Sequence, residues 1–306
     1  MMAVMEGVEC HCGISIGSSP VVGKMHLLQD FVSGRSPCHL HLFVERTYSK
    51  TVSYFKNSVC ELKMGMLIEP IEGRWARLGL RIAHAPTAAT PDIERLFIDT
   101  CGLLPHKPHM LPGLVTWIAL YGNFIARHRL RRLVQACVSP EAKAAAGLIA
   151  ELAIAVGGPQ DLAMTIESCL PIKPGKPLAV AHRSDQAMMK MSEAYAADLS
   201  VKWGLWTAEC EADPRYVMPV QWILTRNPGM RERVVRKGDL RSTILETLRH
   251  DTGGVADSEL ALARLSGATR AAVHSAVYSL VQEGAVEVAP HERHKRKVVI
   301  RLHSPA

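Results

Sequence analysis

Apolar and polar residues follow their clearest pattern in the C-terminal part of the chain. Leucine and isoleucine recur on one face between residues 240 and 248, which is typical of an amphipathic helix. Asp257 or Ser258 can cap a second, shorter helix, and Gly267 suits the left-handed turn that ends it. A third helix is predicted from 269 to 283, where valine and leucine line one side. The pattern therefore predicts three helices joined by tight corners.

Two short strands are predicted after the third helix, because apolar residues alternate over 286–288 and again over 298–302. The predicted loop between them, residues 289–297, is rich in arginine and lysine. From Arg231 to its end, the chain has 13 Lys/Arg and 9 Asp/Glu, a net charge of +4 without histidine. Positive charge concentrated on a small module is typical of a surface that contacts phosphate. We therefore expect ionic strength to weaken the binding of an anionic partner.

This order of elements resembles the winged helix-turn-helix of bacterial transcriptional regulators, broadly the MarR-like and ArsR-like groups. Residues 259–274, ELALARLSGATRAAVH, are similar to the second helix, the turn and the start of the recognition helix. Residues 280–286, LVQEGAV, are similar to the exit into the two-stranded wing. The resemblance covers only the C-terminal part of the chain and is carried by pattern-level motifs. It implies that the helix over 269–283 enters the major groove of DNA.

The resemblance also implies which residues contact DNA. Those near the N-terminus of the third helix are Thr269, Arg270, Ala271, His274 and Ser275. Arg270 is the best candidate for bidentate recognition of a guanine edge. The basic wing, residues 291–297, would contact the DNA backbone or a minor groove. Its basic residues are Arg293, Lys295, Arg296 and Lys297.

The function that the resemblance implies is transcriptional regulation, with repression as the expected mode and double-stranded DNA as the partner. A homodimer would place two recognition helices about 34 Å apart and would prefer an inverted repeat. The alternative is a protein-interaction subunit, for example a toxin-neutralising one, whose winged helix binds protein. In that interpretation the basic loop is merely solvated.

Two further regions are predicted upstream. Residues 64–89 are interpreted as an extended lead-in, because apolar residues alternate near their end. Residues 90–226 are predicted to form an all-helical domain that dimerises, senses a small-molecule or protein effector, or does both. Thr90-Pro91 is expected to cap and start its first helix. Residues 184–211 are predicted as a further helix whose Met and Trp residues line a core or, alternatively, a ligand pocket. The fold class is therefore mainly α: a helical bundle domain followed by the C-terminal winged helix-turn-helix, residues 227–306.

A dense basic run, residues 127–132 with the sequence RHRLRR, allows two interpretations. It is either a second phosphate-contacting surface or the solvated face of a helix. We favour the solvated face, because Leu130 and Leu133 can point inward from the same helix.

Residues 1–63 show no clear pattern. Cys10-His11-Cys12 and the segment 38–41 contain zinc-binding residue types, but Cys10 and Cys12 are closer together than the usual C-x₂₋₄-C spacing. We therefore predict no metal site. Two interpretations stay open: the segment is weakly ordered, or translation starts at Met64 or Met66 and the segment is not made natively.

Composition adds limits to this picture. The chain has 306 residues, 48% of them hydrophobic and 21% charged, which is typical of a globular protein with room for two domains. A formal net charge of +7 fits an anionic partner. No apolar run approaches the roughly twenty residues that span a bilayer, and no secretory signal is recognisable, so we expect a cytoplasmic protein without a membrane partner. The 8 cysteines are scattered, which in the cytoplasm does not indicate disulfides. No catalytic motif or cofactor fingerprint is present, so neither enzymatic activity nor a cofactor is predicted.

Overall fold

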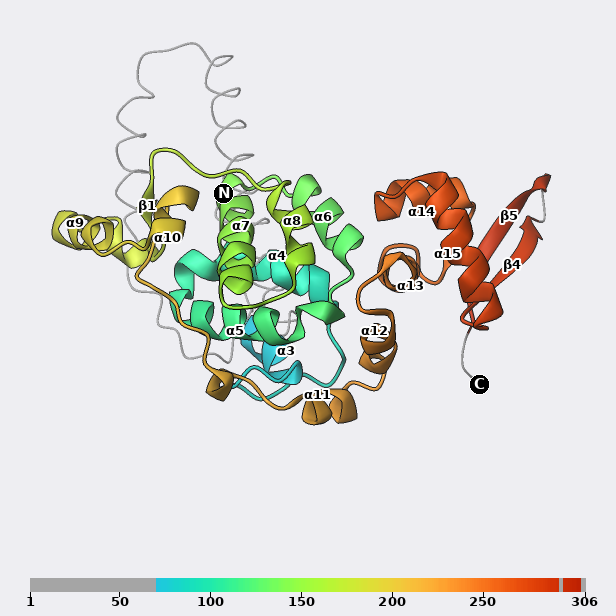
Figure 1. Cartoon of the computed structure of the whole chain (residues 1–306), viewed down its shortest axis with the longest axis horizontal. Helices are drawn as coiled ribbons and strands as arrows, with labels where there is room; N and C mark the ends of the chain where they lie inside the picture. Colours follow the sequence, from blue (N-terminus) through green and yellow to red (C-terminus); the bar gives the residue numbers. More distant parts are fainter. Residues whose placement is uncertain (1–69, 292–293, 304–306) are drawn as a thin grey trace, which may run out of the picture. The chain divides into compact units, whose positions relative to one another are not determined.

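The computed structural model describes residues 70–291 and 294–303, with the backbone alone described at 291 and over 294–298. The described part of the chain is mainly helical and carries small sheets (Figure 1). The hypotheses on residues 1–63, including the zinc-type ligands and the alternative start sites, lie outside the described residues. Within the described ranges, none of the helices has the length and apolar character needed to cross a membrane.

The first part of the described chain, residues 71–236, is called the helical body below. Its α-helices are α3 (Ile71–Arg77), α4 (Ile93–Leu103), α5 (Leu111–Tyr121), α6 (Arg127–Ala136), α7 (Pro140–Ala155), α8 (Ala163–Ile166), α9 (Gln186–Ala194), α10 (Asp198–Trp203), α11 (Val220–Arg226) and α12 (Met230–Arg236). Short 3₁₀ turns link several of them, and β1 (Lys176–Pro177) pairs in parallel with β2 (Leu205–Trp206).

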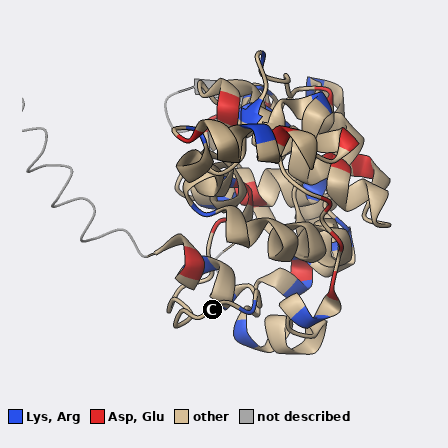
Figure 2. Ribbon diagram, turned by 90° about the vertical axis from the view of Figure 1, so that its left-hand side faces the viewer, with Lys and Arg blue, Asp and Glu red and all other residues tan. Residues whose placement is uncertain are grey.

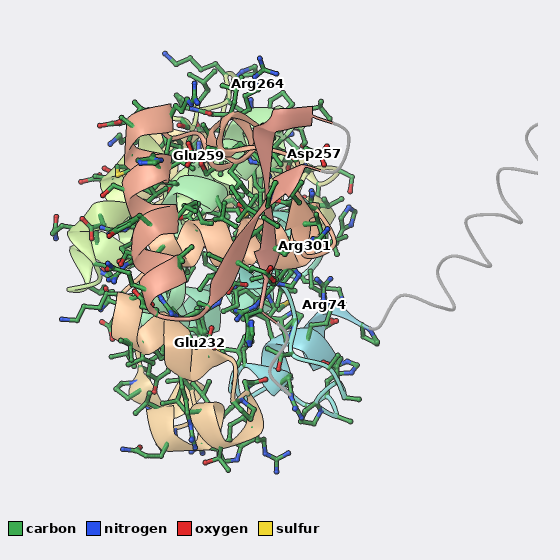
Figure 3. The ribbon with its side chains drawn as sticks, turned by 90° about the vertical axis from the view of Figure 1, so that its right-hand side faces the viewer. Arg74, Glu232, Asp257, Glu259, Arg264 and Arg301 are labelled. Atoms are coloured by element: carbon green, nitrogen blue, oxygen red, sulfur yellow. The ribbon has the colours of Figure 1, made fainter. Side chains whose placement is uncertain are left out.

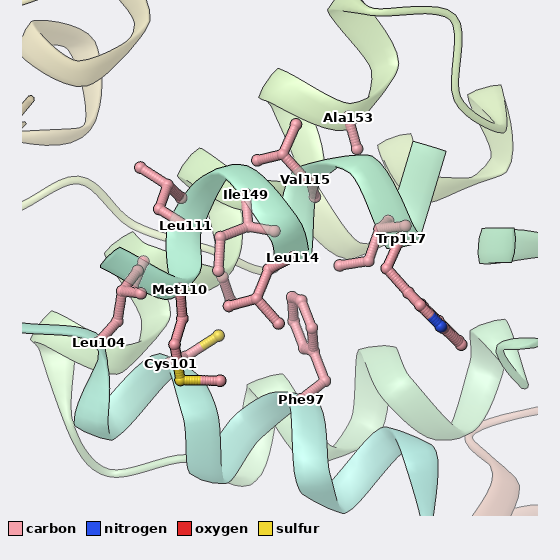
Figure 4. Packing of buried hydrophobic residues seen from close by; sticks show 14 of the residues in the cluster. Phe97, Cys101, Leu104, Met110, Leu111, Leu114, Val115, Trp117, Ile149 and Ala153 are labelled. Atoms are coloured by element: carbon pink, nitrogen blue, oxygen red, sulfur yellow. The ribbon is translucent and has the colours of Figure 1, made fainter. Parts of the chain in front are cut away.

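Helix α7 lies at the centre of the helical body and packs against α4, α5, α8 and α10 (Figure 1). Its alanine-rich sequence suits this place, because small side chains let neighbouring helices approach closely on several sides. Gly147 is required there: a Cβ atom would lie 2.3 Å from the ring of Trp203. Figure 4 shows Ile149 of α7 among Leu114 of α5 and Phe97 of α4. Ser139 caps this helix by accepting a hydrogen bond from the N–H of Ala142.

The second part, residues 240–303, is called the C-terminal module. It contains α13 (Leu240–Asp251), β3 (Val255–Ala256), α14 (Glu259–Ser266), α15 (Arg270–Gln282), β4 (Val286–His291) and β5 (His294–Leu302). The strands form an antiparallel sheet in the order β3-β5-β4. Apolar residues of the three helices and the sheet form a hydrophobic cluster of their own, which is separate from that of the helical body.

The starts and turns of these C-terminal helices follow from local sequence. Ser258 caps α14 by accepting from the N–H of Ala261, and Thr269 caps α15 by accepting from the N–H of Ala272. Gly267 ends α14 with φ +71°, a conformation that L side chains rarely adopt. The predicted corners between the three helices are therefore present.

Three details of the sequence prediction are wrong. Thr90 does not cap the first helix of the predicted helical domain; α4 begins at Ile93 and is capped by Asp92, which also pairs with Arg129. The sheet of the module has three strands, because the short segment after α13 pairs with β5 and adds β3 to the predicted two. The strands also extend into the predicted basic loop, so that β5 begins at His294.

Two predicted segments have a different secondary structure. The predicted extended lead-in, residues 64–89, contains the helix α3, whose Trp75 is fully buried in the core of the body. The alternating apolar residues lie after this helix, where the chain is not helical and Leu80 pairs with Val217 in an antiparallel bridge. Residues 184–211 are not one helix. α9 and α10 are separate, and α10 ends at Gly204, where φ is +70° and a Cβ would lie 2.1 Å from the carbonyl oxygen of Ile172. The chain then continues as β2.

Candidate nucleic-acid interface

Helix α15 presents one apolar and one polar face. Val273, Val277 and Leu280 are buried in the cluster of the module, against α13 and α14. The residues predicted from sequence to contact DNA lie on the opposite, exposed face: Thr269, Arg270, Ala271, His274 and Ser275. The fold thus gathers these five residues at the N-terminal half of one helix. In the described part of the chain, all five residues are exposed to solvent.

Tyr278 extends this exposed face by one more turn and was not singled out from the sequence. Tyr278 is 62% exposed, which is high for a residue type that is usually intermediate in burial. The spacing could have revealed it, because Tyr278 follows His274 by four positions and so lies on the same side of the helix. An aromatic ring at this place can make apolar contact with a thymine methyl group or with a protein surface.

Glu259 is a second residue of this surface that sequence reasoning missed. Its Oε1 lies 2.7 Å from Nδ1 of His274, and its Oε2 lies 3.9 Å from Nε of Arg270. Figure 3 shows Glu259 and Arg264 toward one end of the module, with Arg301 farther along it. No periodic pattern links Glu259 to His274, because the two residues come from different helices that only the turn at Gly267 brings together.

The positive charge of the module is distributed unevenly. Arg241 and Arg249 form ion pairs with aspartate or glutamate, as do Arg233 and Arg236 of α12, the last helix of the helical body. Among the side chains that the structure describes, Arg264 and Arg301 make no such pair. On the side of the ribbon that Figure 2 shows, basic and acidic residues are interspersed rather than gathered on one helix. Among the described side chains of the module, the basic charge available to a phosphate partner thus lies at Arg264 on α14, at Arg270 on α15 and at Arg301.

The four basic residues predicted in the wing are only partly described. Lys295, Arg296 and Lys297 belong to strand β5 rather than to a loop. Arg293 lies outside the described residues, and the side chains of the other three are also outside them. Their predicted contacts with DNA therefore stay predictions.

The basic run in α6 is only partly a solvated face: Leu130 and Leu133 are buried as predicted and Arg131 is 41% exposed, but Arg129 points inward. Arg129 is 1% exposed and donates hydrogen bonds to three carboxylates. The distances are 2.6 and 2.7 Å to Asp92, 3.0 Å to Glu94, and 2.9 and 3.1 Å to Asp251. Arg132 also pairs with Asp251, and Arg127 pairs with Asp161. These cations are already neutralised within the protein and are not available to DNA.

Arg233 of α12 continues this buried network. Its Nη1 lies 2.6 Å from Glu94 and 2.9 Å from the carbonyl oxygen of Phe124, and its Nη2 pairs with Glu246 of α13. Burial alone would raise the pKa of Glu246, but the charge of Arg233 and the hydrogen bond to His250 outweigh it and lower the pKa to about 2. The network therefore joins α4 and α6 of the helical body to α13 of the module through ionised groups.

An open cleft borders this network. Its volume is about 880 Å³, and it is lined by the start of α4, by α12 and α13, and by the end of β5. Arg233, Arg249 and Arg301 contribute cations to its wall, and Glu232 and Glu246 contribute anions. Residues of both the body and the module thus line this cleft.

Metal and thiol chemistry receive no support from the described side chains. These contain no group of three or more His, Cys, Asp or Glu residues arranged to hold a metal ion. Burial raises the pKa of Cys169 to about 12 and that of Cys210 to about 11, so both thiols are protonated at neutral pH. Comparison of the chain with protein-family models, with curated proteins and with solved structures finds no match.

Proposed function

We propose that the protein is a DNA-binding transcriptional regulator whose C-terminal module is a winged helix-turn-helix. The observation that carries the proposal is the exposed polar face at the start of α15, with Arg270, His274 and Ser275 at adjacent positions. Three helices followed by a small antiparallel sheet are typical of this class. In that arrangement α15 lies in the major groove, and the hairpin of β4 and β5 contacts the backbone.

Repression is the expected mode of regulation, and a homodimer is the expected state. Two copies of α15 about 34 Å apart would meet successive major grooves on one side of the duplex. The site bound by such a dimer would be an inverted repeat. Genomic footprinting of the full chain would reveal the site and its symmetry together.

Replacing Arg270 with alanine is expected to weaken binding to the best site by about 10- to 100-fold, because a bidentate contact to guanine is lost. The variant should also discriminate less at one base pair. Fluorescence anisotropy with the footprinted site and its single-base variants measures both effects. Arg215→Ala, at an exposed arginine of the helical body, is the matched control and should bind like the wild type. Wild-type binding without sequence preference would contradict the proposal.

Replacing Lys295 and Lys297 together with glutamine is expected to weaken binding to all sequences alike. Each lysine that contacts a phosphate should also contribute about 1 to the slope of log K against log salt, so the slope should become shallower by about 2. Titrations at several salt concentrations measure this. Lys173→Gln with Lys190→Gln removes the same charge from exposed positions of the helical body. An equal change of slope in both double variants would mean that the wing makes no special contribution.

The alternative function, a protein-binding module, is favoured by two exposed apolar residues. Tyr278 on α15 is 62% exposed, and Leu260 on α14 is 45% exposed. Such side chains are frequent at the centres of protein interfaces. This alternative predicts a stoichiometric protein partner on purification and no retention on heparin at moderate salt, whereas a DNA-binding regulator is retained.

A further inference from the structure

The pair formed by Glu259 and His274 fixes the hydrogen-bonding character of the exposed face of α15. Ser258 caps α14 and so holds Glu259, the first residue of that helix, next to the second turn of α15. The Glu259 side chain is 17% exposed, whereas those of His274 and Arg270 are 70% and 73% exposed. The carboxylate therefore lies beneath two side chains whose ends point to solvent.

The carboxylate determines which ring nitrogen of His274 carries the proton. An ionised carboxylate can only accept hydrogen bonds, so Nδ1, at 2.7 Å from Oε1, must be the donor. In the neutral imidazole the other nitrogen, Nε2, then has no proton and is an acceptor. Within the described part of the chain, Nε2 has no hydrogen-bond partner. In its neutral form the ring thus offers an acceptor to whatever approaches α15.

Arg270 differs from His274 in its relation to Glu259. Its Nε lies 3.9 Å from Oε2, which is longer than a hydrogen bond, so its guanidinium keeps all of its donors for a ligand. The N-terminal half of α15 consequently carries an acceptor at His274, one turn away from an array of donors at Arg270.

We infer that Glu259 sets part of the base preference of the protein by making His274 an acceptor for an exocyclic amino group in the major groove. This inference rests on the proposed DNA-binding function. The groups that match an acceptor there are N4 of cytosine and N6 of adenine, whereas guanine and thymine present acceptors at the corresponding places. Arg270 reads guanine one helical turn away. The preferred site therefore combines a guanine with a nearby cytosine or adenine whose amino group is recognised.

A purely structural role for the pair predicts something different. An exposed His–Glu contact contributes little to stability, so its loss would leave folding and base preference almost unchanged. Dependence of DNA recognition on a single amino group is the property that separates the two roles.

The test begins with selection of preferred sites from randomised duplexes by the full-length wild type. At each cytosine or adenine of the selected site, the base is then replaced by an analogue without the amino group, pyrimidin-2-one or purine. At one position we expect the wild type to lose about tenfold or more in affinity. Glu259→Ala and His274→Ala should lose little at that same position, because the acceptor is no longer held or is absent. Asp257→Ala removes a carboxylate from an exposed place in the same module, outside the hairpin and α15, and should keep the wild-type loss.

The outcomes separate this inference from the proposed function. Selection that yields no preferred sequence with the wild type removes the proposed function itself. Selection that succeeds, with no position sensitive to loss of an amino group, overturns only the inference. The inference is also overturned if removing an amino group at some position weakens binding by the wild type, and Glu259→Ala loses the same affinity there.

Discussion

Replacing Arg129 with leucine is expected to lower the free energy of unfolding by about 3–5 kcal/mol, because three carboxylates lose their buried partner. Arg129 is 1% exposed and donates to Asp92, Glu94 and Asp251. Glu94 is fully buried, so after the substitution it depends on Arg233 and on the N–H of Ala126 alone. Equilibrium unfolding in urea, followed by circular dichroism, measures the loss.

The control lies in the same helix. Arg131→Leu removes an arginine whose side chain is 41% exposed and whose nearest carboxylate, on Glu167, is 3.9 Å away. Exposed pairs of this kind contribute at most about 1 kcal/mol, so this variant should unfold almost like the wild type. Similar losses in both variants would show that Arg129 contributes through its helix and not through the buried network.

The buried network of ion pairs also contributes to how the C-terminal module is held against the helical body. Asp251 and Glu246 belong to α13, the first helix of the module, and their partners Arg129 and Arg233 belong to the helical body. Paired charges need good geometry to offset their loss of hydration, so they favour one arrangement of α13 against α6. Arg233 and Glu246 of this network also line the neighbouring cleft.

Local signals in the sequence were sufficient for most of the C-terminal module. The spacing of apolar residues predicted α15 to within one residue at each end, and Ser258, Thr269 and Gly267 serve as the caps that their residue types indicate. Each of these signals acts within a few residues of the element it defines. The exposure of Arg270 and His274 follows from the same periodicity, because the opposite face is apolar.

Contacts between residues far apart along the chain could not be predicted from such local signals. Charged residues in a helix normally indicate a solvated face, and this led to the wrong interpretation of Arg129. Its burial depends on Asp251, which is 122 positions away along the chain, and no periodicity connects the two. The break at Gly204 was likewise missed, because the Met and Trp residues around it keep a helical spacing although the backbone turns there to pair β2 with β1.

The wild type and Glu246→Gln are expected to differ in their free energy of unfolding. Lowering the pH from 6 to 3 should reduce this difference by roughly 2 kcal/mol. Burial opposes ionisation of Glu246, but Arg233 and His250 hold its pKa at about 2, below its ordinary value of 4.5. A depressed pKa in the folded state gives stability that is present above about pH 4.5 and is lost as the pH falls toward 2. The full contribution is ~3 kcal/mol, and the glutamine variant cannot lose it because glutamine does not titrate.

At pH 6 the glutamine variant should be the less stable protein, because Arg233 then faces one carboxylate instead of two. Urea unfolding of both proteins at pH 6 and pH 3 gives the two differences. Glu167→Gln, at a side chain that is 67% exposed, should differ from the wild type by the same small amount at both pH values. A difference between wild type and Glu246→Gln that does not change with pH would mean that Glu246 is not held ionised by Arg233. The ion pairs would then not be what joins α13 to the helical body.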